Sequence, residues 1–179
     1  AKGLPAFAYI GQNGEPWSLR RGRSFKGAVR VAGKPCAVYH AKRGAGGAWP
    51  DWADEKEPLK AWLVSLGKPC GVLVACDMRA RGVLDLCLEA GIRVPEELCV
   101  IGVDNIPFIC ENTYPRLSSI EPDFIQAGWM AAETLDRLMG GQLRHPVHLV
   151  HGNKGLVERE SSQWFRASLR VAATAYEFI

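Results

Sequence analysis

The 179-residue chain is predicted to be an α/β domain in which a parallel sheet is flanked by helices. Short apolar segments with strand character alternate with longer helical segments along residues 6–103. The segments 71–75 and 98–103 are almost continuously apolar, which is typical of parallel strands buried on both faces. Right-handed crossovers between successive strands would then place helices on both faces of the sheet.

Glycine and proline mark the boundaries of the elements in this first part. Pro16 lies near the start of one helix and Gly33 lies beyond its end, a common placement for these residue types. Gly91 follows another helix in the same way. In chain order we expect a strand over residues 6–10, a helix over 17–31, a strand over 36–40, a Gly- and Ala-rich loop over 41–50, a helix over 55–66, a strand over 71–75, a helix over 78–90 and a strand over 98–103.

The pattern changes after residue 104. Residues 124–139 are amphipathic and are followed by Gly140 and Gly141, so they are predicted to form a helix. Its apolar face would be exposed in this chain, which predicts self-association. The other expected elements are an extended piece over residues 117–121, a hairpin-like pair of strands over 147–151 and 155–160, and a helix over 167–179 that lacks a stop signal.

Composition narrows the class of protein. Basic residues outnumber acidic residues only slightly, 22 against 19. The sequence has no apolar run of about 18 residues, the length that suggests a membrane span, and it begins without the pattern of a secretion signal. The six cysteines lack metal-ligand spacing, which favours buried free thiols, no metal or cofactor, and a cytoplasmic location. They are Cys36, Cys70, Cys76, Cys87, Cys99 and Cys110.

Two carboxylates follow two of the predicted strands. Asp77 comes just after the strand over 71–75, and Asp104 directly follows the strand over 98–103. In an open parallel sheet, ligands bind in the crevice outside the carboxyl ends of the strands. Carboxylates there suit a neutral, hydroxyl-rich ligand, because each can accept several charge-assisted hydrogen bonds.

With these carboxylates in place, the chain resembles the effector-binding domain of LacI/GalR-type repressors, which share the periplasmic sugar-binding fold. It is more similar to the xylose-responsive activators that join such a domain to a C-terminal AraC-type helix-turn-helix module. The motifs that carry this resemblance are Ala75-Cys76-Asp77, Gly91-Ile92-Arg93-Val94-Pro95-Glu96, Gly102-Val103-Asp104-Asn105 and Pro115-Arg116-Leu117-Ser118-Ser119-Ile120.

The resemblance implies a division of the chain. Residues 1–165 would be the sugar effector-binding domain, mainly its C-terminal lobe, and residues 166–179 would begin a linker helix. The first lobe is then expected to precede Ala1, and the DNA-binding module to follow Ile179. The expected partners are a sugar effector, DNA through that absent module, and a second copy in a homodimer.

The resemblance also assigns three charged side chains to the sugar. Asp104 would accept hydrogen bonds from two hydroxyls, and Arg21 would donate to the sugar and neutralise nearby carboxylates. Asp77 would contact the sugar as well, although Cys76 replaces the polar residue that often precedes it in the family. The alternatives are that Asp104 and Asp77 cap helices, and that Arg21 is one charge on a solvated helix face.

Three further residues complete the candidate site. Trp52 matches the aromatic residue that stacks on a sugar ring in the family, a role that Trp49 could share. Phe124 lies at the crossover before its helix and is a weaker candidate. Asn105 is either a ligand contact or a turn residue.

The sequence therefore predicts a sugar sensor, with xylose as the expected effector, in a regulator of sugar catabolism. No catalytic motif accompanies the carboxylates, so we expect no enzymatic activity. The alternatives are the sugar-binding protein of a transporter, or an α/β enzyme in which Asp77 or Asp104 acts as a base. An AraC-type module after Ile179 would distinguish the sensor from both.

Overall fold

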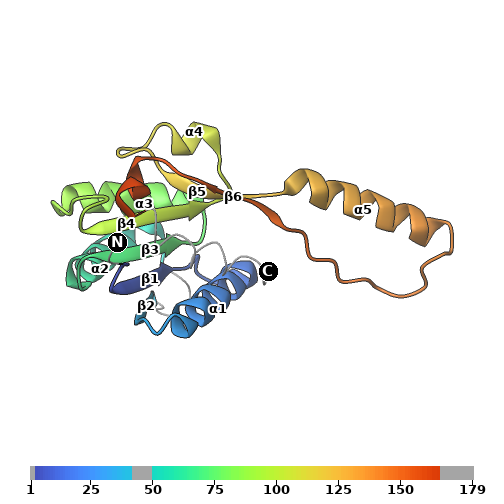
Figure 1. The fold of residues 1–179 in the computed structure, drawn as a ribbon, viewed down its shortest axis with the longest axis horizontal. Helices are drawn as coiled ribbons and strands as arrows, with labels where there is room; N and C mark the ends of the chain where they lie inside the picture. The colour runs from blue at the N-terminus through green and yellow to red at the C-terminus, as the bar shows by residue number, and fades with distance from the viewer. Residues whose placement is uncertain (1–2, 42–49, 166–179) are drawn as a thin grey trace.

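The computed structural model describes residues 3–41 and 50–165, which form a six-stranded sheet flanked by helices (Figure 1). The strand order is β2-β1-β3-β4-β5-β6, in which the first five strands are parallel and β6 runs antiparallel to β5. The predicted α/β fold class is thus confirmed. The strands are β1 (Ala6–Ile10), β2 (Cys36–Tyr39), β3 (Cys70–Val74), β4 (Leu98–Val103), β5 (Ser118–Pro122) and β6 (Asn153–Val157). The helices are α1 (Pro16–Val31), α2 (Trp52–Ser65), α3 (Asp77–Glu89), α4 (Pro107–Cys110), α5 (Phe124–Met139) and the 3-10 helix η2 (Glu160–Phe165).

Alternating side chains of β1 divide the core into two layers. Phe7 and Tyr9 pack with Phe25 of α1, whereas Ala8 and Ile10 belong to the cluster that contains Leu59 of α2 and residues of α3. This alternation follows from the two-residue repeat of a strand. Helices therefore cover both faces of the sheet, which explains why its central strands are apolar throughout.

The start of the second helix and the strand over residues 147–151 differ from the sequence predictions. The second helix begins at Trp52 rather than at residue 55, because the carboxylate of Asp51 accepts a hydrogen bond from the Asp54 N–H at 2.9 Å and caps the helix. Residues 147–151 are not a strand, because they pair with no other segment of the described chain and expose their apolar side chains. The strand over residues 153–157 pairs with β5 instead.

A long excursion leaves the sheet between β5 and β6. Figure 1 shows α5 extending away from the body, followed by an irregular return to β6. We call residues 123–152 the arm. None of the α5 residues is buried, and the helix exposes six large apolar side chains. They are Phe124, Ile125, Trp129, Leu135, Leu138 and Met139.

Parts of three predicted features lie outside the described residues. These are the expected loop, of which residues 42–49 lie outside, Trp49 as a possible stacking residue, and the whole helix expected over 167–179. In the described part of the chain, no helix has the length and apolar character needed to cross a membrane.

The first prediction concerns the exposed face of α5. This chain in isolation should self-associate, because a cluster of large apolar side chains is costly to leave in water. Light scattering over a range of concentrations should show species larger than a monomer. The double substitution Ile125→Gln and Trp129→Gln should reduce their amount, and a monodisperse monomer in the unsubstituted chain would contradict the prediction.

Candidate functional site

Both carboxylates predicted to bind a ligand lie at the carboxyl edge of the sheet. Strands β3 and β4 are parallel neighbours, with Leu73 opposite Ile101 in their register. Asp77 begins α3 shortly after β3, and Asp104 directly follows β4. Burial raises the pKa of Asp104, the neighbouring Arg21 guanidinium opposes that effect, and repulsion from the Asp77 carboxylate adds to it.

Asp104 faces Arg21, which projects from α1. Arg21 Nη2 lies 3.4 Å from Asp104 Oδ1, and Arg21 Nη1 donates to the Ala75 carbonyl at 2.5 Å. The guanidinium carbon also lies 4.9 Å from the centre of the Trp17 ring. The Asp104 side chain remains 25% exposed, so this ion pair is accessible to solvent.

The backbone at Asp104 is held in an uncommon conformation. Asp104 has a φ of 110°, and Asn105 has a φ of 50°. Non-glycine residues adopt positive φ rarely, and such strain tends to occur at functional sites. The Asp104 N–H donates to the Ile120 carbonyl of β5 at 2.9 Å, which ties this turn to the neighbouring strand.

Asp77 differs from Asp104 because it is completely buried. Its carboxylate accepts hydrogen bonds from Ser119 Oγ at 2.6 Å, the Ile106 N–H at 2.8 Å and Cys110 Sγ at 3.3 Å. Burial raises the pKa of Asp77, and these three donors oppose that effect. Burial and the adjacent Asp77 charge also raise the pKa of Cys110, to about 12, so its thiol remains a donor. In this conformation Asp77 orients the turn after β4 and presents no surface to a ligand.

The capping alternatives are wrong for both carboxylates. Cys76 occupies the N-cap position of α3, and Ile106 occupies that of α4. Of the two roles expected for Asn105, the structure shows that of a turn residue. Its side-chain amide is bound to Glu121 and Arg159.

Trp52 lies in the first turn of α2, and its ring rests against Gly82 of α3, where an added Cβ would overlap the indole. It lines a cavity of about 560 Å³ together with residues from the β1–α1 loop, α2 and α3. Trp52 is 42% exposed, so one part of the ring is available to a ligand. Trp52 and the Arg21–Asp104 pair therefore occupy different parts of the carboxyl edge.

The sequence analysis missed an ion pair beneath this cavity. Arg79 donates to both carboxylate oxygens of Glu55, at 2.5 and 3.1 Å, and Asn13 donates to the same carboxylate at 3.2 Å. The Arg79 and Glu55 side chains are only 6% and 3% exposed. Nothing in the local sequence distinguishes these two residues from surface charges, because 24 positions separate them.

Phe124 stands at the base of the arm, just beyond the end of β5. Its side chain is 59% exposed and its ring centre lies 6.3 Å from that of His151. Since β5 is parallel to β4, Phe124 is on the same edge of the sheet as Asp104.

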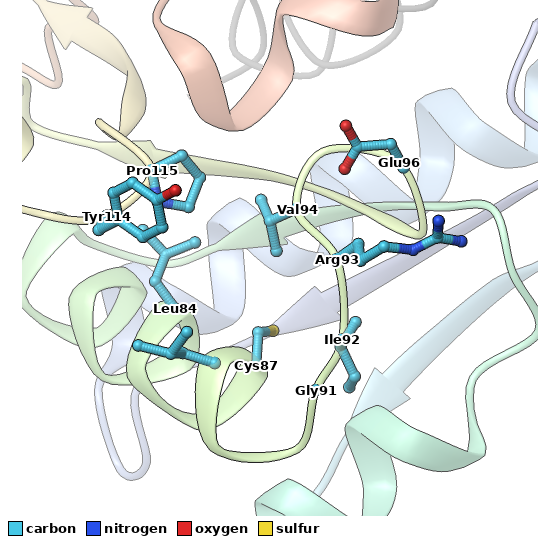
Figure 2. Close-up of a pocket in the computed structure, with 10 residues that line it drawn as sticks. Leu84, Cys87, Gly91, Ile92, Arg93, Val94, Glu96, Tyr114 and Pro115 are labelled. Carbon is cyan, nitrogen blue, oxygen red and sulfur yellow. The ribbon is translucent and has the colours of Figure 1, made fainter.

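A second hollow, of about 400 Å³, lies at the opposite edge (Figure 2). Its lining includes Ile92 and Val94, which precede β4, and Tyr114 and Pro115, which precede β5. None of the sequence-predicted site residues lines it. The carboxyl edge is therefore the better candidate site.

Comparisons with known proteins identify a matching family and similar proteins. Residues 1–162 match the family model of the periplasmic binding protein-like domain. The chain is 35% identical over 149 residues to the xylose operon regulatory protein of Haemophilus influenzae, covering 79% of this chain and 36% of that protein. It is 30% identical over 166 residues to the xylose operon regulatory protein of Escherichia coli K12, covering 91% and 42%.

Solved structures show the same fold. A xylose-binding transcription activator superposes with a TM-score of 0.76 at 27% identity, covering 96% of this chain and 45% of that chain. A LacI family transcriptional regulator from Arthrobacter, in complex with lactose, gives a TM-score of 0.67 at 29% identity, with coverage of 89% and 57%. The chain spans less than half the length of the two curated relatives.

The second prediction tests the close packing around Asp77. Gly102 of β4 has no room for a Cβ, because that atom would overlap Asp77 Oδ1. Gly102→Ala should lower the free energy of unfolding by about 2 kcal/mol, as overpacking does in other cores. Gly27→Ala is the matched control: space is open around Gly27 in α1, so the substitution should stabilise the chain by up to about 1 kcal/mol. Urea unfolding of both variants checks this, and equal effects would contradict it.

The third prediction concerns pH. Burial raises the pKa of Asp77 in the folded chain, so Asp77 favours folding most at low pH and this contribution is lost as the pH rises through the raised pKa. The melting temperature of the unsubstituted chain relative to Asp77→Asn should therefore fall as the pH rises from about 3.5 to 7. A difference that stays constant or grows with pH would show that burial of the charge is not the dominant effect.

Proposed function

Because the chain belongs to the family of periplasmic binding protein-like domains, we propose that it is one lobe of the effector-binding domain of a sugar-responsive transcription regulator. The observation that supports this most strongly is the accessible Arg21–Asp104 pair at the carboxyl edge of the sheet. A guanidinium donates to hydroxyl oxygens and a carboxylate accepts from hydroxyl hydrogens, so the pair can hold adjacent hydroxyls of a sugar. Two relatives are regulators of xylose operons, which makes xylose the proposed effector.

The other site residues have separate roles in this proposal. Trp52 is the proposed stacking platform for the apolar face of the sugar, although the cavity that it lines includes neither Arg21 nor Asp104. Asp77 acts as a positioning residue rather than as the direct contact expected from the sequence, since its oxygens already bind Ser119, Ile106 and Cys110. Phe124, at the base of the arm, is a further candidate contact for the sugar, on the side from which a second lobe would approach.

We propose that this second lobe covers the arm. The six exposed apolar side chains of α5 need a partner, and a segment outside this sequence that packs on them would complete a crevice above Asp104 and Arg21. A sugar held between the two lobes would favour the closed arrangement by its difference in affinity for the closed and open states. This difference in affinity sets how far sugar binding can shift the regulator from the open to the closed state.

We further propose how the lobe belongs to the whole regulator. Residues 1–165 form the sensor part, and residues 166–179 lead toward an AraC-type DNA-binding module in a homodimer. The role is binding rather than catalysis, in keeping with relatives that are named as regulators. All six cysteines are free, which is compatible with the reducing cytoplasm.

The fourth prediction tests the sugar site. Xylose, with a panel of other pentoses and hexoses, is titrated by calorimetry into the complete natural protein that carries this sequence. Asp104→Asn should raise the dissociation constant at least about tenfold, because it removes a charge-assisted acceptor. Asparagine tolerates the positive φ of this position, so the backbone is preserved.

Asp54→Asn, at an exposed position in α2, serves as the control and should leave the dissociation constant unchanged. Binding of a sugar other than xylose would support the sugar-sensing proposal but identify a different effector. No heat from any sugar would overturn the sugar-sensing proposal.

A further inference from the structure

The side chain of Asn105 links β5 to the segment that follows β6. Asn105 Nδ2 donates to Glu121 Oε2 at 2.9 Å, and Asn105 Oδ1 accepts from Arg159 Nη1 at 3.0 Å. Glu121 belongs to β5, which leads into the arm, and Arg159 follows β6, which returns from it. Asn105 is also the residue next to Asp104, so one amide connects the proposed ligand site to β5 near the start of the arm and to the segment that follows β6.

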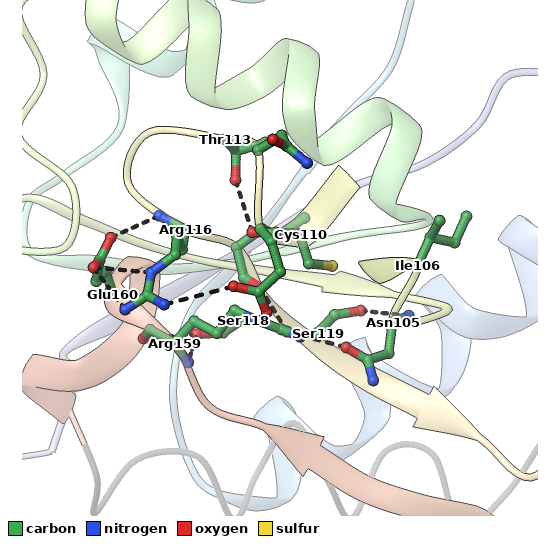
Figure 3. A network of polar contacts seen from close by, with 12 residues as sticks. Asn105, Ile106, Cys110, Thr113, Arg116, Ser118, Ser119, Arg159 and Glu160 are labelled. Atoms are coloured by element: carbon green, nitrogen blue, oxygen red, sulfur yellow. Dashed lines mark hydrogen bonds and ion pairs between the residues drawn. The ribbon is translucent and has the colours of Figure 1, made fainter. Parts of the chain in front are cut away.

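Arg159 is itself firmly held (Figure 3). Its Nε donates to Glu111 Oε1 at 2.6 Å, and the same Nη1 that binds Asn105 donates to the Leu117 carbonyl at 3.0 Å. Its backbone N–H and carbonyl bind Ser118 Oγ at 2.7 and 2.9 Å. The side chain is 11% exposed. The guanidinium therefore has a defined position from which to orient the Asn105 amide.

We propose that Arg159 is a positioning residue for the ligand site, acting through Asn105 on the turn that presents Asp104. This inference rests on the proposed function of Asp104. The turn contains two consecutive residues at positive φ, a conformation that persists only where the surroundings enforce it. The Ser119 hydroxyl holds the Asn105 N–H at 3.0 Å, and Arg159 and Glu121 hold the side chain. Without Arg159, the turn would lose the hydrogen bond that links it to the segment after β6.

The arrangement also assigns a different role to Asn105. Both polar ends of its side-chain amide are used within the protein, so it connects elements rather than donating to a sugar. A shift of the arm at the end of β5 would move Glu121 and, through Asn105, the backbone at Asp104. Ligand binding at Asp104 and the orientation of the arm are thereby coupled in both directions.

The chain offers a matched pair of arginines for the test. Arg116 binds the same Glu111 as Arg159, at 3.5 Å, and its main partner is Glu160. Arg116→Met therefore removes a cation from the same cluster without touching Asn105. Arg159→Met should raise the dissociation constant for the sugar about tenfold in the complete natural protein, as loss of a hydrogen bond to a charged group does, whereas Arg116→Met should change it less than about twofold. Equal effects of the two variants would overturn the proposal.

A double variant separates positioning from general destabilisation. If Arg159 acts through Asn105, Arg159→Met combined with Asn105→Ala should bind sugar no more weakly than the worse single variant. Additive losses would overturn the proposal. Should Arg159→Met not fold, Arg159→Lys replaces it, since lysine retains a charge near Glu111 but lacks the planar fork that reaches Asn105.

A readout without ligand keeps this inference distinct from the proposed function. Amide hydrogen exchange at Asn105 and Ile106 should be about tenfold faster in Arg159→Met than in Arg116→Met, because the turn opens locally more often. Unchanged exchange would overturn the positioning role whether or not sugar binds. Faster exchange in a protein that binds no sugar would support the positioning role and overturn only the proposed function.

Discussion

The buried carboxylate of Asp77 is the interaction on which the carboxyl edge of the sheet depends. It gathers donors from β5, from the turn after β4 and from α4, which are Ser119, Ile106 and Cys110. A buried charge is tolerated only when its hydrogen bonds are satisfied, so these three elements have one compatible arrangement. That arrangement determines where the backbone delivers Asp104. The residue that shapes the site is therefore hidden, and the residue proposed to contact the ligand lies beside it.

Two of the ion pairs at this edge have different environments. The Glu55–Arg79 pair is almost completely buried and makes close contacts on both carboxylate oxygens, so it joins α2 to α3 and supports the wall that carries Trp52. The Arg21–Asp104 pair is longer, at 3.4 Å, and both side chains are partly exposed. Hydroxyl groups of a ligand can replace this long contact on both partners, because the guanidinium donates and the carboxylate accepts. Rigid support and an exchangeable contact thus coexist at one edge.

Much of the fold was predictable because its signals are local. Continuous apolar runs identified β3 and β4, and Gly33 and Gly91 marked the ends of α1 and α3. Asp104 was placed correctly because a parallel strand delivers its last residue to a known edge. The burial of Asp77 was not predictable in the same way, because it depends on Ser119 and Ile106, which lie 42 and 29 positions away. Residues 147–151 have a strand-like pattern, but a strand also needs a partner, which no local pattern reveals.

The two ends of the arm meet at its base, where the Asp123 N–H donates to the Gly152 carbonyl at 3.2 Å. Strands β5 and β6 are already antiparallel neighbours at that point, as in a β-hairpin. The thirty residues between them are therefore topologically a single large hairpin loop. Evolution could lengthen, replace or delete such a loop without rethreading the sheet. A protein engineer could likewise substitute a tight two-residue turn and obtain a minimal lobe that retains Asp77, Asp104 and Arg21 on an unchanged scaffold.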